Sequence, residues 1–587
     1  MKTKINNSVK WVVCAALLTI HYPLFTGCSD MLNTDSDLVE FEADNTLDHA
    51  TDSVYSVLGI VNKMQAIADR TVLLGEARAD LMVTTDAASD ALKRLANFDF
   101  SEANKYNEIS DYYAVINNCN YFIAHIDTSM VRRGINVFKP EYAAVKSFRA
   151  WTYLQLALNY GEVPLILEPL MTEIEAREAM NQPKVNLKTI CNTFIDDLTP
   201  LVDINLPVFG TIDGWNSQRF FIPMRVLLGD LCLWAERYPE AAKWYHDYLT
   251  DQRDPIELDF SNRSTWPSTT VFNDPTKRYG ITGNEVVTFI PMETRAFNGV
   301  VSQLVNIYNS TTKNYNYFEL TYSPAMQNLS AAQTYCTEVS ISIAPAVRDT
   351  VYVQPDNLRS VLYKGDLRLT SNYSVRAYGS DDEFSEYGST YQTINKVSSS
   401  RVVLYRRSMI YLHYAEALNR AGFPQSAMCV LKYGMCQANT SKFVDDVERA
   451  QAGSLIYFDP TVYKLDNGMI FGDAAYHRNI YGIHAYGCGD AHANKDYVLP
   501  QPPTAKATRK DTVDYQIPLV ENMIIDEMAL EGAFEGNRFY DLMRVALRRN
   551  DPAYLADPIS KRKGSDSADA ELYSRLLDTS NWYLPLN

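Results

Sequence analysis

Helical patterns dominate the first half of the chain. Apolar residues recur with a helical period over residues 47–69, 112–126 and 141–158. The third segment is apolar on most of its faces, so we expect that helix to be largely buried. Gly161 is expected to end it, and residues 163–166 should leave it in an extended conformation.

A weak internal repeat links residues 233–242 with residues 417–427. Each copy ends a helix rich in small and apolar residues, and then places an aromatic residue, a proline and an alanine in the same order. A proline in the first turn is typical of a helix start. The repeat therefore predicts antiparallel helix pairs of the tetratricopeptide kind, although the copies lie too far apart for a tandem solenoid.

The helical period fades in two other regions, about 255–400 and 455–516. Stretches of the first region are rich in Asn, Ser, Thr, Gly and Tyr, and Gly, His, Tyr and Pro recur throughout the second. Both compositions predict loops and short strands, and residues 285–290 are one predicted strand. We therefore predict a mainly α fold. Its scaffold of helix pairs lies mainly in residues 46–250 and 401–440, and a loop-rich, short-strand binding subdomain is embedded in it.

The most informative segment lies near the C-terminus, at residues 524–544. It predicts two short helices joined at Gly536, within a signature region at 520–550. Three glutamates recur every four residues and so share one helical face, and two arginines each follow an acid by three residues. This spacing predicts a partly buried ion network that fixes the two helices. Its members are Glu527, Glu531, Glu535, Arg538, Asp541 and Arg544.

The N-terminus has the pattern of an export signal. Three lysines precede the apolar run at residues 11–20, which is too short to span a bilayer. The segment Leu-Phe-Thr-Gly-Cys that ends at Cys28 resembles the lipobox of bacterial lipoproteins, whose cysteine carries the lipid. We expect a signal peptide at residues 1–27 and an acidic flexible tether at 28–45. An ordinary cleaved signal with an incidental cysteine is the alternative.

Charge and cysteine content narrow the function further. The net charge of −17 argues against nucleic acid or an anionic membrane as partner, because either would need a basic face. Once Cys14 and Cys28 are set aside, seven of the nine cysteines remain, with no regular spacing, so we expect buried free thiols. Cys429 and Cys436 are seven residues apart on a predicted helix and should share a face.

Four spaced motifs resemble the SusD/RagB family of nutrient-binding lipoproteins on the surface of Bacteroidota-type bacteria. They lie at residues 149–165, 406–422, 535–544 and 582–587, and the resemblance covers nearly all of the mature chain. It implies a single SusD-like domain at residues 46–587. It also implies a palmitate-type lipid anchor at the outer membrane and exposure on the cell surface. The partner would be a TonB-dependent, SusC-like transporter, with this protein as its lid and the helix pairs facing it.

Patterns typical of catalysis are lacking in the sequence. It contains no Gly-x-Ser-x-Gly elbow, no phosphate-binding Gly-Lys loop and no His-Glu-x-x-His. His477, His484 and His492 cluster with acids and Cys488, but spacings of seven and eight residues fit no usual metal-ligand pattern. We therefore expect neither an enzyme nor a cofactor. A glycosidase-type carboxylate pair stays open, because carboxylates are abundant.

Ligand binding is expected from loop tyrosines and their polar neighbours. The chain has 39 Tyr, whose flat faces and polar edges suit sugar rings, although most should pack in the core. In the resembling family, the region before the second long helix supplies ligand contacts. Three loop arcs are candidates: the first around residues 78–107, the second around 315–318 and the third at 481–486. The candidate contacts are Arg78, Asp80, Phe98, Asn104, Tyr106, Tyr315, Tyr317 and Tyr486.

Two ligand classes fit the sequence equally. Loop Tyr and Asn favour an oligosaccharide, whereas some members of the resembling family serve peptide uptake, for which the acidity here would favour basic peptides. A surface-anchored hydrolase is a third hypothesis. The sequence alone names neither the sugar nor its linkage.

Overall fold

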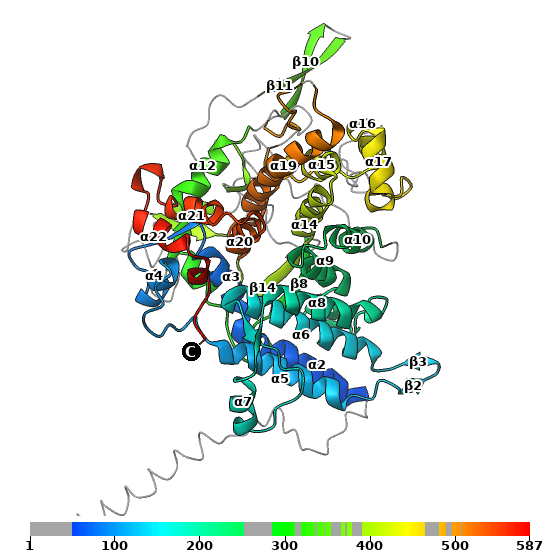
Figure 1. Cartoon of the computed structure of the whole chain (residues 1–587), viewed down its shortest axis with the longest axis vertical. Coiled ribbons are helices and arrows are strands. Elements are labelled where there is room, and N and C mark those ends of the chain that lie inside the picture. The colour runs from blue at the N-terminus through cyan, green and yellow to red at the C-terminus, as the bar shows by residue number, and fades with distance from the viewer. Residues whose placement is uncertain are drawn as a thin grey trace, which may run out of the picture.

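The computed structural model describes residues 50–251, 285–310, 318–334, 337–344, 347–353, 365–369, 373–377, 390–463, 481–488, 496–504 and 506–586. The fold is mainly α-helical, as the sequence predicts, and its strands are short (Figure 1). Within the described residues, no helix combines the length and apolar character that crossing a membrane requires. The predicted signal peptide, Cys28 and the tether lie outside these residues.

The N-terminal helices match the predicted segments, with shifted ends. The first predicted helix is two helices, because the chain turns at Met64 between them. The long buried helix carries a proline in its first turn and ends at Gly161, which has a φ of 74° as its predicted stop role requires. These helices are α2 (Ala50–Lys63), α3 (Gln65–Glu76), α5 (Ile109–His125) and α6 (Lys139–Tyr160), and the short α4 (Asp90–Ala96) was not predicted.

The predicted helix pairs form a continuous stack. Helices α5, α6, α8, α9, α10 and α14 pack successively on one another, and α19 packs on α14 (Figure 1). Both repeat copies start their second helix with a proline in the first turn, and α10 of the first copy packs on α14 of the second. The pairs comprise α8 (Leu187–Leu198), α9 (Met224–Trp234), α10 (Tyr238–Leu249), α14 (Arg407–Arg420) and α15 (Pro424–Met428).

For Cys429 and Cys436, the predicted buried free thiols are confirmed, but the predicted shared helix face is wrong. Both thiols are buried and free, as are those of Cys119, Cys191, Cys232 and Cys488. They share no helix face, because Cys429 opens a π-helical turn that ends before Gly434, and Cys436 only caps the next helix, α16 (Gln437–Phe443). Gly434 has a φ of 89°, which breaks the helical period that the spacing assumed.

The strands form two-stranded antiparallel sheets. The predicted strand is β8 (Val286–Pro291), which pairs with β14 (Arg401–Arg406) and so ties the loop-rich part to the start of α14. The other pairs are β1 (Met82–Thr84) with β9 (Leu320–Tyr322), β2 (Val131–Arg132) with β3 (Ile135–Asn136), β4 (Val163–Pro164) with β5 (Lys184–Val185), β6 (Thr211–Ile212) with β7 (Trp215–Asn216), β10 (Thr337–Ala344) with β11 (Val347–Val353), and β12 (Tyr373–Ala377) with β13 (Thr390–Ile394).

The C-terminal signature forms two helices, as predicted. Helix α19 (Arg509–Gly532) begins with a capping box at Thr508, and α20 (Arg538–Arg549) follows a turn in which Gly536 has a φ of 96°. The remaining α-helices are α7 (Glu173–Ala179), α11 (Leu304–Tyr308), α12 (Pro324–Ala332), α17 (Asp446–Ala452), α18 (Ala485–Cys488), α21 (Ala553–Ser560) and α22 (Ala570–Leu576).

Candidate functional site

A buried arginine from the loop-rich part organises the glutamates of α19. Arg368 donates to Glu527 Oε1 at 2.5 Å and to Glu531 Oε2 at 3.0 Å, and it also holds Asp366 at 2.6 Å. All four side chains are inaccessible to solvent. Burial opposes ionisation, but the charge of Arg368 outweighs it and lowers the pKa of Glu527 to about 2. Glu527 therefore stays ionised beside the Arg368 guanidinium at neutral pH.

Two further cations complete this network. Arg406 donates to Glu531 Oε1 at 3.0 Å and to Glu535 Oε2 at 2.7 Å, and Lys396 Nζ lies 2.5 Å from Glu535 Oε1. Both cations come from the segment that leads into α14. The network therefore binds α19 to two segments that precede it by more than a hundred residues. These contacts give the network a structural role rather than a ligand-binding one.

The predicted partner of Arg538 is wrong. Arg538 forms two hydrogen bonds to Asp80, at 2.7 and 2.8 Å, and not an ion pair with Glu535. Helix α19 ends at Gly532, so Glu535 lies in the turn, where a spacing of three residues does not align side chains. The other predicted pair, Arg544 with Asp541, is confirmed at 2.9 Å.

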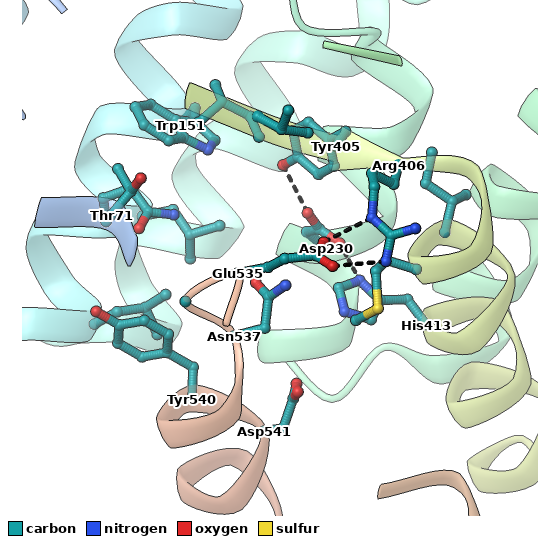
Figure 2. A pocket seen from close by; sticks show the side chains of 18 of the residues that line it. Thr71, Trp151, Asp230, Tyr405, Arg406, His413, Glu535, Asn537, Tyr540 and Asp541 are labelled. Carbon is teal, nitrogen blue, oxygen red and sulfur yellow. Dashed lines mark hydrogen bonds and ion pairs between the residues drawn. The ribbon is translucent and has the colours of Figure 1, made fainter. Parts of the chain in front are cut away.

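A small polar cavity of about 90 Å³ lies between α3, α6, α9, α14 and the turn before α20 (Figure 2). Asp230 accepts a hydrogen bond from Tyr405 at 2.7 Å and lies 3.0 Å from His413 Nδ1. Burial opposes charge on His413, but the bond to Asp230 raises the net pKa of this imidazole. Ligand pockets commonly hold roughly 300–1,000 Å³. This cavity therefore has room for only a few water molecules and serves the packing of the scaffold.

Three of the predicted ligand contacts lie in the protein interior. Arg78 is fully buried and donates to the carbonyl of Trp582 at 2.9 Å and to Asn159 Oδ1 at 2.6 Å. Asp80 is the partner of Arg538, and Phe98 is buried beneath the C-terminal helices. In this conformation these side chains contact protein, and their role in ligand binding stays a prediction.

Asn104 and Tyr106 are covered but lie close to the surface. The Asn104 amide donates to the carbonyl of Ala91 at 2.8 Å and accepts from the backbone of Tyr106 at 3.0 Å. Tyr106 is 7% exposed, and the exposed Lys105 lies 5.0 Å from the centre of its ring. Burial, reinforced by the nearby Glu319 carboxylate, raises the pKa of Tyr106, so its hydroxyl stays neutral.

The structure brings the first predicted arc against the end of the second. Strand β1 pairs with β9, so Met82 lies opposite Tyr322. The Thr85 hydroxyl donates to the carbonyl of Phe318, and the backbone of Ser89 donates to Glu319 Oε2 at 2.8 Å. Residues 82–107 and 318–322 thus form one surface, which we call the junction. Tyr315 and Tyr317, just before Phe318, lie outside the described residues.

The arrangement of helices in this chain is similar to that of several solved structures. Neither the family models nor the curated proteins give a match. A SusD superfamily protein from Bacteroides vulgatus superposes with a TM-score of 0.51 at 13% identity, over 92% of this chain and 96% of that one. A SusD-like carbohydrate-binding protein from Bacteroides fragilis gives 0.50 at 15% identity, over 86% and 87%. The chain has the SusD-like fold.

Within this SusD-like fold, the third arc is packed inside the loop-rich part. Tyr486 is 1% exposed, so the predicted contact is covered here too. Its neighbours His484 and Cys488 converge with Asp366, with one donor atom of each lying within 4.8 Å of the others. The predicted histidine partners His477 and His492 lie outside the described residues.

This convergence fits protein contacts better than a metal ion. Asp366 already binds Arg368, and His484 Nδ1 lies 2.8 Å from Glu527. The Cys488 thiol donates a hydrogen bond to Asp366 Oδ2 at 3.3 Å, and burial raises its pKa well above the usual value. The three residues therefore extend the buried ion network of the SusD-like fold.

Proposed function

We propose that this protein binds oligosaccharides at the junction. The observation that carries the proposal is the β1–β9 pairing. It brings chain within the first predicted arc, between residues 80 and 97, against residues 320–322, which directly follow the second arc, on a SusD-like scaffold. The B. fragilis protein of the same fold is described as carbohydrate-binding. The junction includes half-buried Phe100 and Tyr322 and exposed Lys105, so it offers both apolar faces and polar groups.

In this proposal the protein is a lid without catalytic activity. The lid opens on a TonB-dependent, SusC-like transporter, the glycan fills the shared space, and closure hands it over. The stacked helix pairs would form most of the surface that faces the transporter, which leaves the junction free to contact glycan. We also propose the domain limits predicted from the sequence, which are a signal peptide at residues 1–27, a tether at 28–45 and a single domain at 46–587.

Replacing Tyr106 or Tyr317 with alanine should weaken glycan binding by more than about 1 kcal/mol, the scale of one aromatic contact. Calorimetric titration of the soluble chain starting at Ser29, against plant and host polysaccharide hydrolysates, measures this. Tyr106→Phe keeps the buried ring and so separates lost packing from a lost hydroxyl contact. Tyr457→Ala is the matched control, because Tyr457 is 54% exposed and lies outside the junction. Unchanged affinity in both alanine variants would refute the junction as the site.

The same titration tests the two alternatives. A peptide-binding protein of the same lid type would give heat only with a peptide digest. Because the chain carries a net charge of −17, binding of basic peptides should weaken as salt is added, whereas glycan binding should not change. A surface hydrolase would consume its ligand. Recovery of intact glycan after long incubation therefore argues against hydrolysis.

The membrane anchor and the transporter partner form the second part of the proposal. Lipid on Cys28 should hold the mature chain at the outer membrane, exposed on the cell surface. Labelled palmitate should enter the wild-type chain but not the Cys28→Ser variant. Gentle detergent extraction of wild-type cells should recover the protein together with a TonB-dependent transporter. Palmitate labelling that persists in the variant, or recovery without a transporter, would contradict the respective claim.

A further inference from the structure

A larger pocket, distinct from the junction, opens where several scaffold elements end. It holds about 570 Å³, within the range of roughly 300–1,000 Å³ that small-ligand sites commonly occupy. The ends of α6 and α9, the start of α8, the last turns of α20 and residues 580–583 enclose it. We call it the aromatic pocket, after the half-buried rings of Trp234, Tyr238 and Tyr583 that line it.

Neighbouring residues of the pocket lining hold the three rings in place. The Arg544 guanidinium lies 5.2 Å from the centre of the Trp234 ring, and Arg548 lies 5.8 Å from that of Tyr238. The Tyr583 ring packs so closely on Gly161 that an added Cβ would lie 3.2 Å from it. Rings fixed before a ligand arrives lose little conformational entropy on binding, which favours affinity.

The basic side chains around the pocket are already paired. Arg544 donates to Glu416 Oε2 at 2.6 Å, and Arg548 donates to Glu416 Oε1 at 3.1 Å. At the rim, Lys188 lies 3.8 Å from Glu236, and both side chains are more than half exposed. An anionic ligand would have to compete with Glu416 or Glu236 for these basic groups, so the lining disfavours an anion. Exposed Glu162 also lines the pocket, and its carboxylate can accept hydrogen bonds from a neutral ligand.

The remaining lining residues provide apolar surface and hydrogen-bonding groups. Leu547 is 40% exposed and Leu187 is half-buried, and both add apolar surface to the lining. Exposed Asn186 and Ser580 add an amide and a hydroxyl at the rim. A sugar ring has this same division, with apolar C–H faces and a polar edge.

We propose that the aromatic pocket is a second binding site, for one or two rings of a neutral oligosaccharide. The ring lies against Trp234 and Tyr583 and directs its hydroxyls to the amide and hydroxyl rim. This inference rests on the proposed carbohydrate binding, but it uses none of the residues of the junction. A long glycan chain would thus contact the protein at two separate places.

The test uses the soluble chain from Ser29 with four neutral probes: cellohexaose, maltohexaose, mannohexaose and xylohexaose. Calorimetry gives the stoichiometry and affinity, and saturation-transfer NMR reports contact with the sugar. Trp234→Ala should weaken one of two binding events by about tenfold, the effect of losing one aromatic contact. Leu547→Glu, at an exposed helix position, should do the same without loss of buried packing. Trp244→Ala is the matched control, because this half-buried tryptophan of the neighbouring helix α10 does not line the pocket.

The outcomes separate the two sites. If binding falls in the Trp234 and Leu547 variants but not in Tyr106→Ala, the pocket is confirmed and the junction is refuted. If it falls only in Tyr106→Ala, the pocket is refuted and the junction stands. If none of the four probes binds to the wild-type chain, both are refuted. Two events that are lost one at a time confirm both sites.

Discussion

Replacing Arg368 with methionine is expected to lower the free energy of unfolding by about 3–5 kcal/mol, the usual cost of removing one partner from a buried ion pair. The variant leaves Asp366, Glu527 and Glu531 buried around an uncharged side chain, and all of them are inaccessible to solvent. Urea denaturation followed by circular dichroism measures the change. The loss should be smaller at a pH below the usual pKa range of carboxyl groups, because protonation then removes the uncompensated charges.

A surface arginine provides the matched control. Arg177 pairs with Glu173 at 2.6 Å, but the two side chains are 77% and 79% exposed. Arg177→Met should therefore change the free energy of unfolding by less than about 1 kcal/mol. Equal stabilities for the two variants would show that Arg368 is not the centre of the network.

The second large effect is expected at a backbone contact. Gly75 in α3 meets the turn before α20 so closely that a Cβ built on it would lie 1.6 Å from the carbonyl oxygen of Gly536. Because backbone cannot rotate away as a side chain can, Gly75→Ala should destabilise the fold by about 3 kcal/mol or more. Thermal unfolding of the purified chain measures this.

Another helical glycine tests whether this cost is local. Gly59 lies in α2, and a Cβ built there would meet nothing within 4 Å. Gly59→Ala should raise stability by about 0.5–1 kcal/mol, since alanine is the better helix former. A Gly75→Ala variant as stable as Gly59→Ala would mean that α3 and the turn separate easily.

The sequence predicted elements better than partners. Helical periodicity located α5 and α6 closely, because α5 buries an apolar face in the core and α6 is buried on most of its faces. It joined α2 and α3, because the turn at Met64 keeps helical backbone angles and leaves no Gly or Pro signal. The break was predicted at Gly536, although α19 already ends at Gly532, and this misassigned the partner of Arg538.

The sequence predicted the glutamates of the ion network but not their partners Arg368 and Arg406. The spacing of Glu527, Glu531 and Glu535 reveals a shared face, because i and i+4 contacts are local. Arg368 lies 159 residues from Glu527 and Arg406 lies 125 residues from Glu531, and no periodicity relates such positions. Only the folded chain shows that these arginines neutralise the face.

The two proposed binding surfaces were harder to predict than the ion network. The junction depends on two three-residue strands, β1 and β9, whose pairing joins distant segments and is too short to leave a sequence signal. Trp234 lies in the internal repeat and Tyr583 in the C-terminal motif, and neither was predicted to contact a ligand. Their role in the aromatic pocket arises because several helix ends meet, which neither motif encodes.

The way in which the loop-rich part is attached has an evolutionary consequence. It joins the helical stack at a few fixed places, among them the β8–β14 pair and the Asp366–Arg368 contact with α19. Stretches of chain between such attachment points can gain or lose residues without altering the buried partners of the scaffold. Selection can therefore exchange ligand preference by loop replacement while the stacked helices stay constant. For protein engineering, these attachment points are natural boundaries for grafting loops between proteins of this fold.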